Sequence, residues 1–79
     1  MFKITVFRFD SFLHMVNSCD GPVNLILPDG RKENISRQYL TQYELQKQYI
    51  ENNNSLNLTL EVPAISDYFK VVNYSIGVG

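Results

Sequence analysis

The sequence has little of the chemistry on which most enzymes and metal proteins depend. Its 79 residues include one cysteine and one histidine. A single cysteine excludes a disulfide within the chain, so no disulfide framework supports the fold. Metal sites of the common kinds need several His, Cys and carboxylate ligands in one place, and the sequence shows no such cluster. We therefore predict neither a metal nor another cofactor.

Long hydrophobic runs and an excess of one charge are also missing. No stretch is apolar enough for a transmembrane helix, and the N-terminal MFKITVFRFD lacks the continuous apolar run of a secretory signal. Seven basic and eight acidic residues give a formal net charge of −1, without the basic excess of nucleic-acid binders. We expect a cytoplasmic protein that stays out of the membrane and whose main partner is not nucleic acid.

Motifs for catalysis are absent too. The four glycines are scattered over turns and the C-terminus, so they form no phosphate-binding loop. His14 and Cys19 suggest a nucleophile and its base, but five residues apart on a short helix their side chains diverge by about 140°. No oxyanion motif accompanies them. We predict a protein without enzymatic activity, and a small enzyme that uses His14 is the third of three functional hypotheses.

What the chain does have is apolar and aromatic side chains. Hydrophobic residues make up 44% of the sequence and aromatic residues 13%, which is enough for a compact core and argues against disorder. The length predicts a single compact domain over residues 1–79. A chain this short buries only roughly 60–65% of its unfolded surface, so its stability is expected to be marginal.

The main helix is predicted over residues 41–53. Thr41 and Glu44 have the spacing of a capping box, and Leu40 and Leu45 that of a hydrophobic staple. Ser36 is an alternative N-cap, which would start the helix about one turn earlier. The apolar stripe expected to face the core consists of Tyr43, Leu45, Tyr49 and Ile50. The three asparagines at positions 52–54 are expected to end the helix, because Asn tolerates the left-handed conformation.

Strict alternation of apolar and polar residues predicts the strands. Residues 56–62 (LNLTLEV) alternate fully before Pro63, which indicates a strand with one buried face. Residues 2–9 (FKITVFRF) predict a first strand with apolar groups on both faces. A short helix over residues 11–19 is expected to follow, with Asp10 as its cap.

A hairpin and a last strand complete the predicted sheet. Residues 23–27 form a strand, Pro28–Asp29–Gly30 is a strong turn signal, and residues 31–35 form a return strand so polar that we place it at an edge. Residues 69–78 (FKVVNYSIGV) predict the last strand, with Val72, Tyr74, Ile76 and Val78 on one face.

The expected fold is α+β, with one mostly antiparallel sheet of four or five strands and the main helix across one face. The predicted order is β α β β α β β, and its first six elements match the ferredoxin-like arrangement. That arrangement places the third strand in the centre of the sheet, where RKENI would be a poor fit. A β-grasp-like sheet with the hairpin at the rim is therefore a competing prediction.

The first functional hypothesis is a non-catalytic module that binds another protein. Tyr and Phe favour interfaces because they offer a large rigid contact area, and the candidate partner-binding residues are Phe7, Phe9, Tyr39, Tyr43, Tyr74 and Ile76. Asn, Ile, Tyr, Phe and Lys are abundant, as in low-GC genomes. Small binders from such genomes are often phage or mobile-element regulators that inhibit a host enzyme, which we adopt as the finer hypothesis.

Two further expectations depend on the sheet. A face that exposes Phe7 and Phe9 would suit the stacking of single-stranded nucleic acid, which is the second functional hypothesis. The last strand would be an uncovered edge beside apolar side chains, and such edges pair readily with a second copy. We therefore expect a homodimer through residues 69–78.

Overall fold

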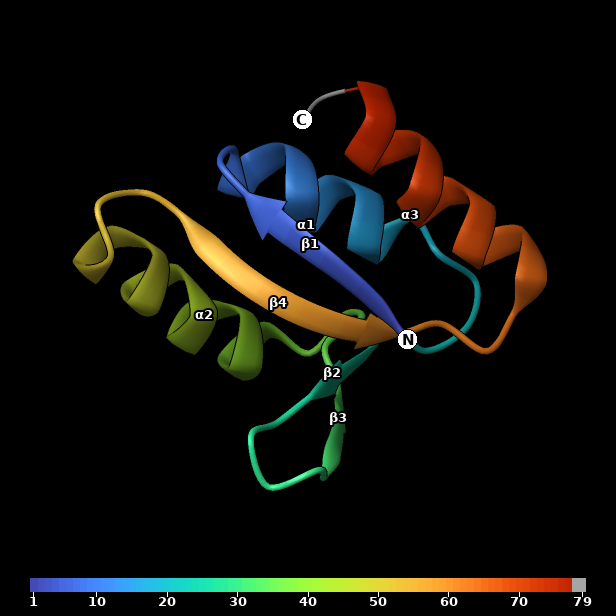
Figure 1. Cartoon of the computed structure of the whole chain (residues 1–79), viewed down its shortest axis with the longest axis horizontal. Helices are drawn as coiled ribbons and strands as arrows, with labels where there is room; N and C mark the ends of the chain where they lie inside the picture. The colour runs from blue at the N-terminus through green and yellow to red at the C-terminus, as the bar shows by residue number, and fades with distance from the viewer. Residues whose placement is uncertain (78–79) are drawn as a thin grey trace.

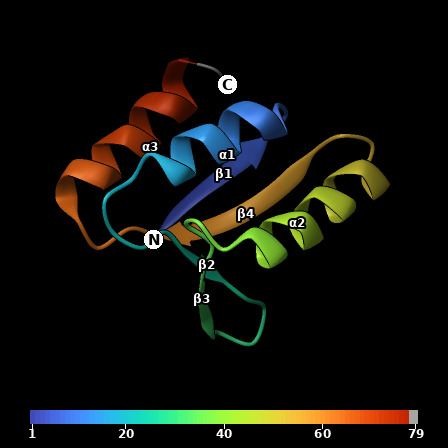
Figure 2. The ribbon, with the colours of Figure 1, turned by 180° about the vertical axis from the view of Figure 1, so that it is seen from behind.

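The computed structural model describes residues 1–77, and it confirms the α+β class. The elements, in chain order, are β1 (Phe2–Val6), α1 (Phe9–Asn17), β2 (Asn24–Ile26), β3 (Lys32–Asn34), α2 (Tyr39–Glu51), β4 (Leu56–Glu61) and α3 (Ile65–Gly77). The four strands form one antiparallel sheet. Helix α1 passes behind β1 in Figure 1 and in front of it in Figure 2, with α2 and α3 on either side.

The strand order in the sheet is β1-β4-β2-β3, which differs from the ferredoxin-like order that the element sequence suggested. Strand β3 lies at the rim of the sheet, and β4 lies between β1 and β2. The physical reason is the composition of β3, whose Lys32 and Glu33 are exposed and have no apolar group to bury. The polar hairpin thus occupies the edge, as the competing prediction required.

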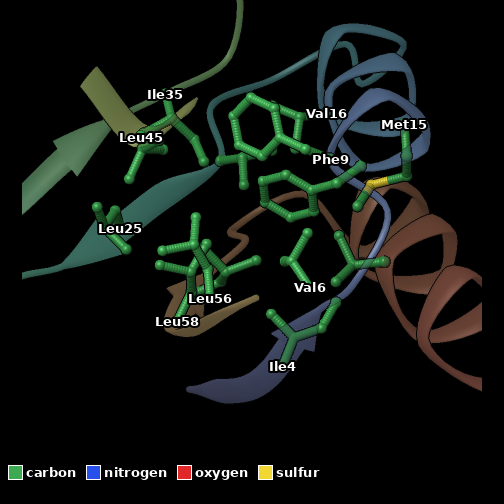
Figure 3. Close-up of a cluster of buried hydrophobic side chains, with 14 of the residues drawn as sticks. Ile4, Val6, Phe9, Met15, Val16, Leu25, Ile35, Leu45, Leu56 and Leu58 are labelled. Carbon is green, nitrogen blue, oxygen red and sulfur yellow. The ribbon is translucent and has the colours of Figure 1, made fainter. Parts of the chain in front are cut away.

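The core lies between one face of the sheet and the helices (Figure 3). Ile4 faces Leu58 and Val6 faces Leu56 across the β1–β4 pair, and all four side chains are buried. The alternation predicted for β4 is confirmed. Its buried face packs with the inward residues of α1, which are Phe9, Phe12, Met15 and Val16.

The predicted first strand is too long. Strand β1 ends at Val6, and Phe9 begins α1, two residues before the predicted start at position 11. Phe9 is only 3% exposed, because its ring packs beside Phe12 and Tyr49. Asp10 is not the cap of this helix: the N-cap is Arg8, and Asp10 lies in the first turn.

The predicted start of the main helix is also wrong. Helix α2 begins at Tyr39, after an N-cap residue, Gln38, that makes no side-chain capping bond. Leu40 is 84% exposed, so it forms no staple. The physical reason is Gln42, which is buried and donates from Nε2 to the Ile35 carbonyl (2.8 Å) and to Asn17 Oδ1 (2.7 Å). This amide determines which side of α2 faces inward.

The rest of α2 agrees with the sequence in part. Leu45 is buried and Tyr49 is half-buried, as predicted, whereas Tyr43 and Ile50 are exposed. The helix ends at Glu51. Asn53 and Asn54 have φ values of 56° and 61°, so the asparagines take the left-handed conformation expected of them. The turn at Pro28–Asp29–Gly30 is likewise confirmed, with Gly30 at φ 90°.

The last predicted strand is a helix. Helix α3 covers residues 65–77, and Val78 lies outside the described residues. Its inward residues are Asp67, Val71 and Tyr74, at the spacing of four and three that a helix needs. Contacts with α1, among them the Phe12–Tyr74 ring pair, therefore outweigh the strand preference of Val, Tyr and Ile. Residues 69–77 form no edge strand, so the edge argument for a homodimer fails.

Side chains from two later segments converge on the C-terminal end of α1. Arg37 Nη1 donates to the Cys19 carbonyl (2.6 Å), and Ser36 Oγ donates to the Val16 carbonyl (3.3 Å). Lys70 Nζ of α3 donates to the Ser18 carbonyl (2.8 Å). Helix ends leave carbonyls without partners inside the helix, and cations near that end are favourable. We call this set of contacts the α1 junction.

Asp67 completes the α1 junction from α3. Its carboxylate accepts from the backbone N–H of Gly21 (2.7 Å) and of Asp20 (3.1 Å). These two hydrogen bonds lower the pKa of Asp67, against the opposing effect of burial. A Cβ at position 21 would lie 3.3 Å from Asp67 Oδ2, so glycine permits this close approach.

The pKa of Asp67 predicts an acid-sensitive contact. Because the folded-state pKa is lowered, the carboxylate stabilises the fold above the ordinary Asp pKa of about 3.9, and this contribution is lost as the pH falls below it. Asp67→Asn should have a lower urea midpoint at neutral pH and a smaller change of midpoint on acidification than wild type. Asn73→Ala, at an exposed position of the same helix, removes no titratable group, so it is the control and should keep the wild-type pH dependence. If the urea midpoint of Asp67→Asn changed with pH as much as that of wild type, the Asp67 carboxylate would not be the acid-sensitive contact.

The start of α2 yields a prediction from two neighbouring residues. Gln42→Ala should lower the free energy of unfolding by about 1–3 kcal/mol, because the Ile35 carbonyl loses the closer of its two donors and keeps only the Gln38 N–H at 3.4 Å. Thr41→Ala is the matched control. It should leave the free energy of unfolding unchanged within error, because α2 begins without a side-chain capping bond. Urea melts of both variants decide this, and a cost of about 1 kcal/mol for Thr41→Ala would restore the capping box.

Candidate protein-binding surfaces

The structure distributes five of the six predicted partner-binding residues over three places. Tyr39 and Tyr43 are exposed on α2, and Phe7 is exposed just after β1. Ile76 is exposed on α3, where Tyr74 is half-buried and donates its hydroxyl to the Arg8 carbonyl (3.2 Å). The sixth residue, Phe9, is a core residue and is not accessible to a partner. The six residues therefore do not form one site.

The two candidate catalytic residues, His14 and Cys19, differ in their exposure to solvent. His14 is exposed, whereas Cys19 is buried. Burial, followed by the charge of Asp67, raises the pKa of the Cys19 thiol, which keeps it in the unreactive protonated form. Within residues 1–77, no three His, Cys, Asp or Glu side chains are grouped so that they could hold a metal ion. The same residues contain no helix with the length and apolar character that crossing a membrane requires.

The open face of the sheet is polar. Lys3, Thr5 and Asn57 are exposed there, and Thr5 Oγ1 donates to Asn57 Oδ1 (2.7 Å) across the β1–β4 pair. Phe9 does not contribute to this face, because it belongs to the core. The stacking platform that the nucleic-acid hypothesis needed therefore loses one of its two aromatic residues.

Helix α3 carries a second apolar face, opposite to the buried one. Ile65, Phe69 and Ile76 are 72%, 56% and 77% exposed, and Val72 is half-buried. These four residues, which we call the α3 stripe, follow one another at intervals of four, three and four. At about 100° per residue they lie within about 60° of one another. Such spacing is that of the seam through which one helix packs on another.

A groove of about 880 Å³ lies between α2, β4 and the β2–β3 hairpin. Its residues are Leu25, Ile26, Leu27, Pro28 and Glu33 of the hairpin, Leu40, Thr41, Glu44, Leu45 and Gln48 of α2, and Asn57, Leu58 and Thr59 of β4. In Figure 1, α2 and the hairpin lie on the same side of β4, where α2 runs alongside the strand and the hairpin points away from it. The volume is within the range of typical ligand sites, roughly 300–1,000 Å³.

The groove exists because β2 and β4 pair over a short distance only. Strand β1 pairs with β4 at five positions, from Phe2–Leu60 to Val6–Leu56. Strand β2 pairs with β4 at two, Asn24–Glu61 and Leu25–Leu60. The first four residues of β4, Leu56 to Thr59, therefore have a strand neighbour on the β1 side alone. We call this segment the free edge of β4.

Sequence reasoning missed both surfaces. The α3 stripe had a usable signal, since its spacing of four, three and four is visible in the sequence once the strand interpretation is set aside. The groove had none, because it depends on how far two strands pair. No protein-family model, curated protein or solved structure matches the chain.

Proposed function

We propose that this chain is a non-catalytic protein-binding module, and that a second copy of the chain binds its α3 stripe. The observation that carries the proposal is the exposed stripe of Ile65, Phe69, Val72 and Ile76 on a helix whose opposite face is already buried. Tyr68 adds to the apolar surface beside the stripe, where its ring makes edge contacts with Phe2 and Phe69. An apolar face of this kind is typical of a protein interface.

A second copy is the favoured partner because the stripe complements itself. When two α3 helices pack antiparallel about a two-fold axis, Ile65 lies opposite Ile76 of the other copy and Phe69 lies opposite Val72. Each large side chain then meets an apolar one. No charged residue lies within the stripe, so self-association brings no like charges together along the seam. The expected homodimer therefore uses the same end of the chain as the sequence suggested, but through helices instead of edge strands.

The finer hypothesis, a regulator or inhibitor of a host enzyme from a phage or mobile element of a low-GC bacterium, keeps its compositional basis. A small dimer that binds protein is compatible with such a role. The nucleic-acid alternative has less support, because the open sheet face is polar and Phe9 is buried. The hypothesis of a small enzyme has less support as well, since Cys19 is buried with a raised pKa.

The homodimer can be tested by sedimentation equilibrium. Wild type should sediment near twice its 9.2 kDa at high micromolar concentration. Phe69→Lys and Ile76→Lys should each weaken dimerisation at least about tenfold, because each removes an apolar contact and places a charge in the seam. Circular dichroism should show that both variants stay folded, since neither side chain belongs to the core.

Tyr43→Lys provides the matched control. It replaces an exposed aromatic residue on α2, outside the α3 stripe, and should leave the dimer intact. A wild type that is monomeric at all concentrations would contradict the second copy as the partner of α3. A dimer that Tyr43→Lys disrupts, and that Phe69→Lys does not, would place the interface on α2 instead.

A further inference from the structure

The free edge of β4 has unused hydrogen-bonding capacity. In a strand, alternate residues turn their N–H and C=O groups towards the same edge. Beyond Leu25, strand β2 no longer supplies partners to β4, so the groups that residues 56–59 turn towards the groove have no strand opposite them. At about 3.3 Å per residue this edge is about 13 Å long. Exposed edges of this kind readily accept another strand.

The walls of the groove suit apolar side chains. Leu25, Leu45 and Leu58 are buried members of the core that also line the groove, which gives it an apolar floor. Leu40 stands at the first turn of α2 and also lines the groove, although most of its surface is exposed. Packing within residues 1–77 does not explain why an apolar residue occupies this exposed position. An apolar side chain entering the groove would cover it.

The rim of the groove is acidic. Glu33 of the hairpin and Glu44 of α2 are the charged residues that line it, and no lysine or arginine lines it. Both carboxylates are exposed. Ion pairs within residues 1–77 join Asp29 to Arg31 and Glu61 to Lys32, so neither glutamate is neutralised by a cation of the described chain. A ligand that brings a positive charge would therefore be favoured.

We propose that the groove binds an extended segment of another protein, which adds as a strand along the free edge of β4. The segment has apolar residues in alternate positions and a lysine or arginine between them, which lies near Glu33 and Glu44. This binding mode is β-augmentation, in which backbone hydrogen bonds supply affinity and alternate side chains supply specificity. The inference rests on the proposed role in protein binding, but it uses a surface separate from the α3 stripe.

The probe for the test is the octapeptide KVKLKVKL, labelled with a fluorophore at its N-terminus. Its acidic counterpart EVELEVEL has the same apolar residues, and a third peptide carries proline at the two central positions. We expect the cationic peptide to bind at least tenfold more tightly than the acidic one in fluorescence anisotropy. The proline peptide should bind at least tenfold more weakly than the parent, because proline has no N–H to donate.

Charge reversal makes the test specific to the groove. A variant with both Glu33→Lys and Glu44→Lys should reverse the preference, binding EVELEVEL at least tenfold more tightly than KVKLKVKL. Glu51→Lys is the control, because Glu51 is exposed on α2 outside the groove. This variant should keep the preference for the cationic peptide. Amide chemical shifts should change at residues 56–59 and at Leu27 when the peptide is added.

Three results obtained with peptides that bind would overturn the proposal. They are equal binding of the cationic and acidic peptides, a charge-reversed variant that keeps the wild-type preference, and shift changes confined to the open sheet face or to α3. The Phe69→Lys variant separates this proposal from the dimer, because it should keep peptide binding while dimerisation is lost. Failure of the peptide to bind a chain that still dimerises would refute the groove and leave the proposed function standing.

Discussion

The arrangement of the helices depends on how the C-terminal end of α1 is satisfied. Carbonyls at a helix end and the N–H groups that follow need partners, and here Arg37, Asp67 and Lys70 supply them from distant parts of the chain. Arg37 takes a φ of 56°, which is unusual for a residue with a side chain. Its backbone N–H and guanidinium both bond to the end of α1, so these contacts hold the unusual conformation in place.

Polar contacts beside the end of α1 orient the two helices that carry the proposed surfaces. Gln42 turns one side of α2 towards Asn17 and Ile35, which leaves Leu40 and Glu44 of the same helix beside the groove. Asp67 turns one side of α3 towards Gly21, and the opposite side of α3 then carries Ile65, Phe69, Val72 and Ile76. Two sets of polar contacts, those of Gln42 and those of Asp67, thus determine which sides of α2 and α3 stay exposed. This explains why exposed apolar residues occur on a chain with so small a core.

The sequence predicted those parts of the fold that neighbouring residues determine. The alternation in β4, the turn at Gly30 and the asparagines after α2 each depend on a few adjacent residues, and all three are confirmed. Helix α3 was misassigned because its stabilising contacts join Asp67 to residues 46 and 47 positions away. The capping box at Thr41 failed for a similar reason, since Gln42 bonds to Asn17 at a separation of 25. Local patterns cannot reveal such distant partners, and the groove also depends on strand pairing over a long separation.

The positions of the two surfaces allow them to be occupied together. In both Figure 1 and Figure 2, α2 and α3 lie on opposite sides of the β1–β4 pair, so a second copy packed on the α3 stripe leaves the groove beside α2 open. A dimer would then present two grooves in a fixed relation. A partner that carries two suitable segments gains avidity from such an arrangement, because binding of the first raises the effective concentration of the second. Dimerisation through α3 would in this way strengthen a weak, short-segment interaction that one groove alone provides.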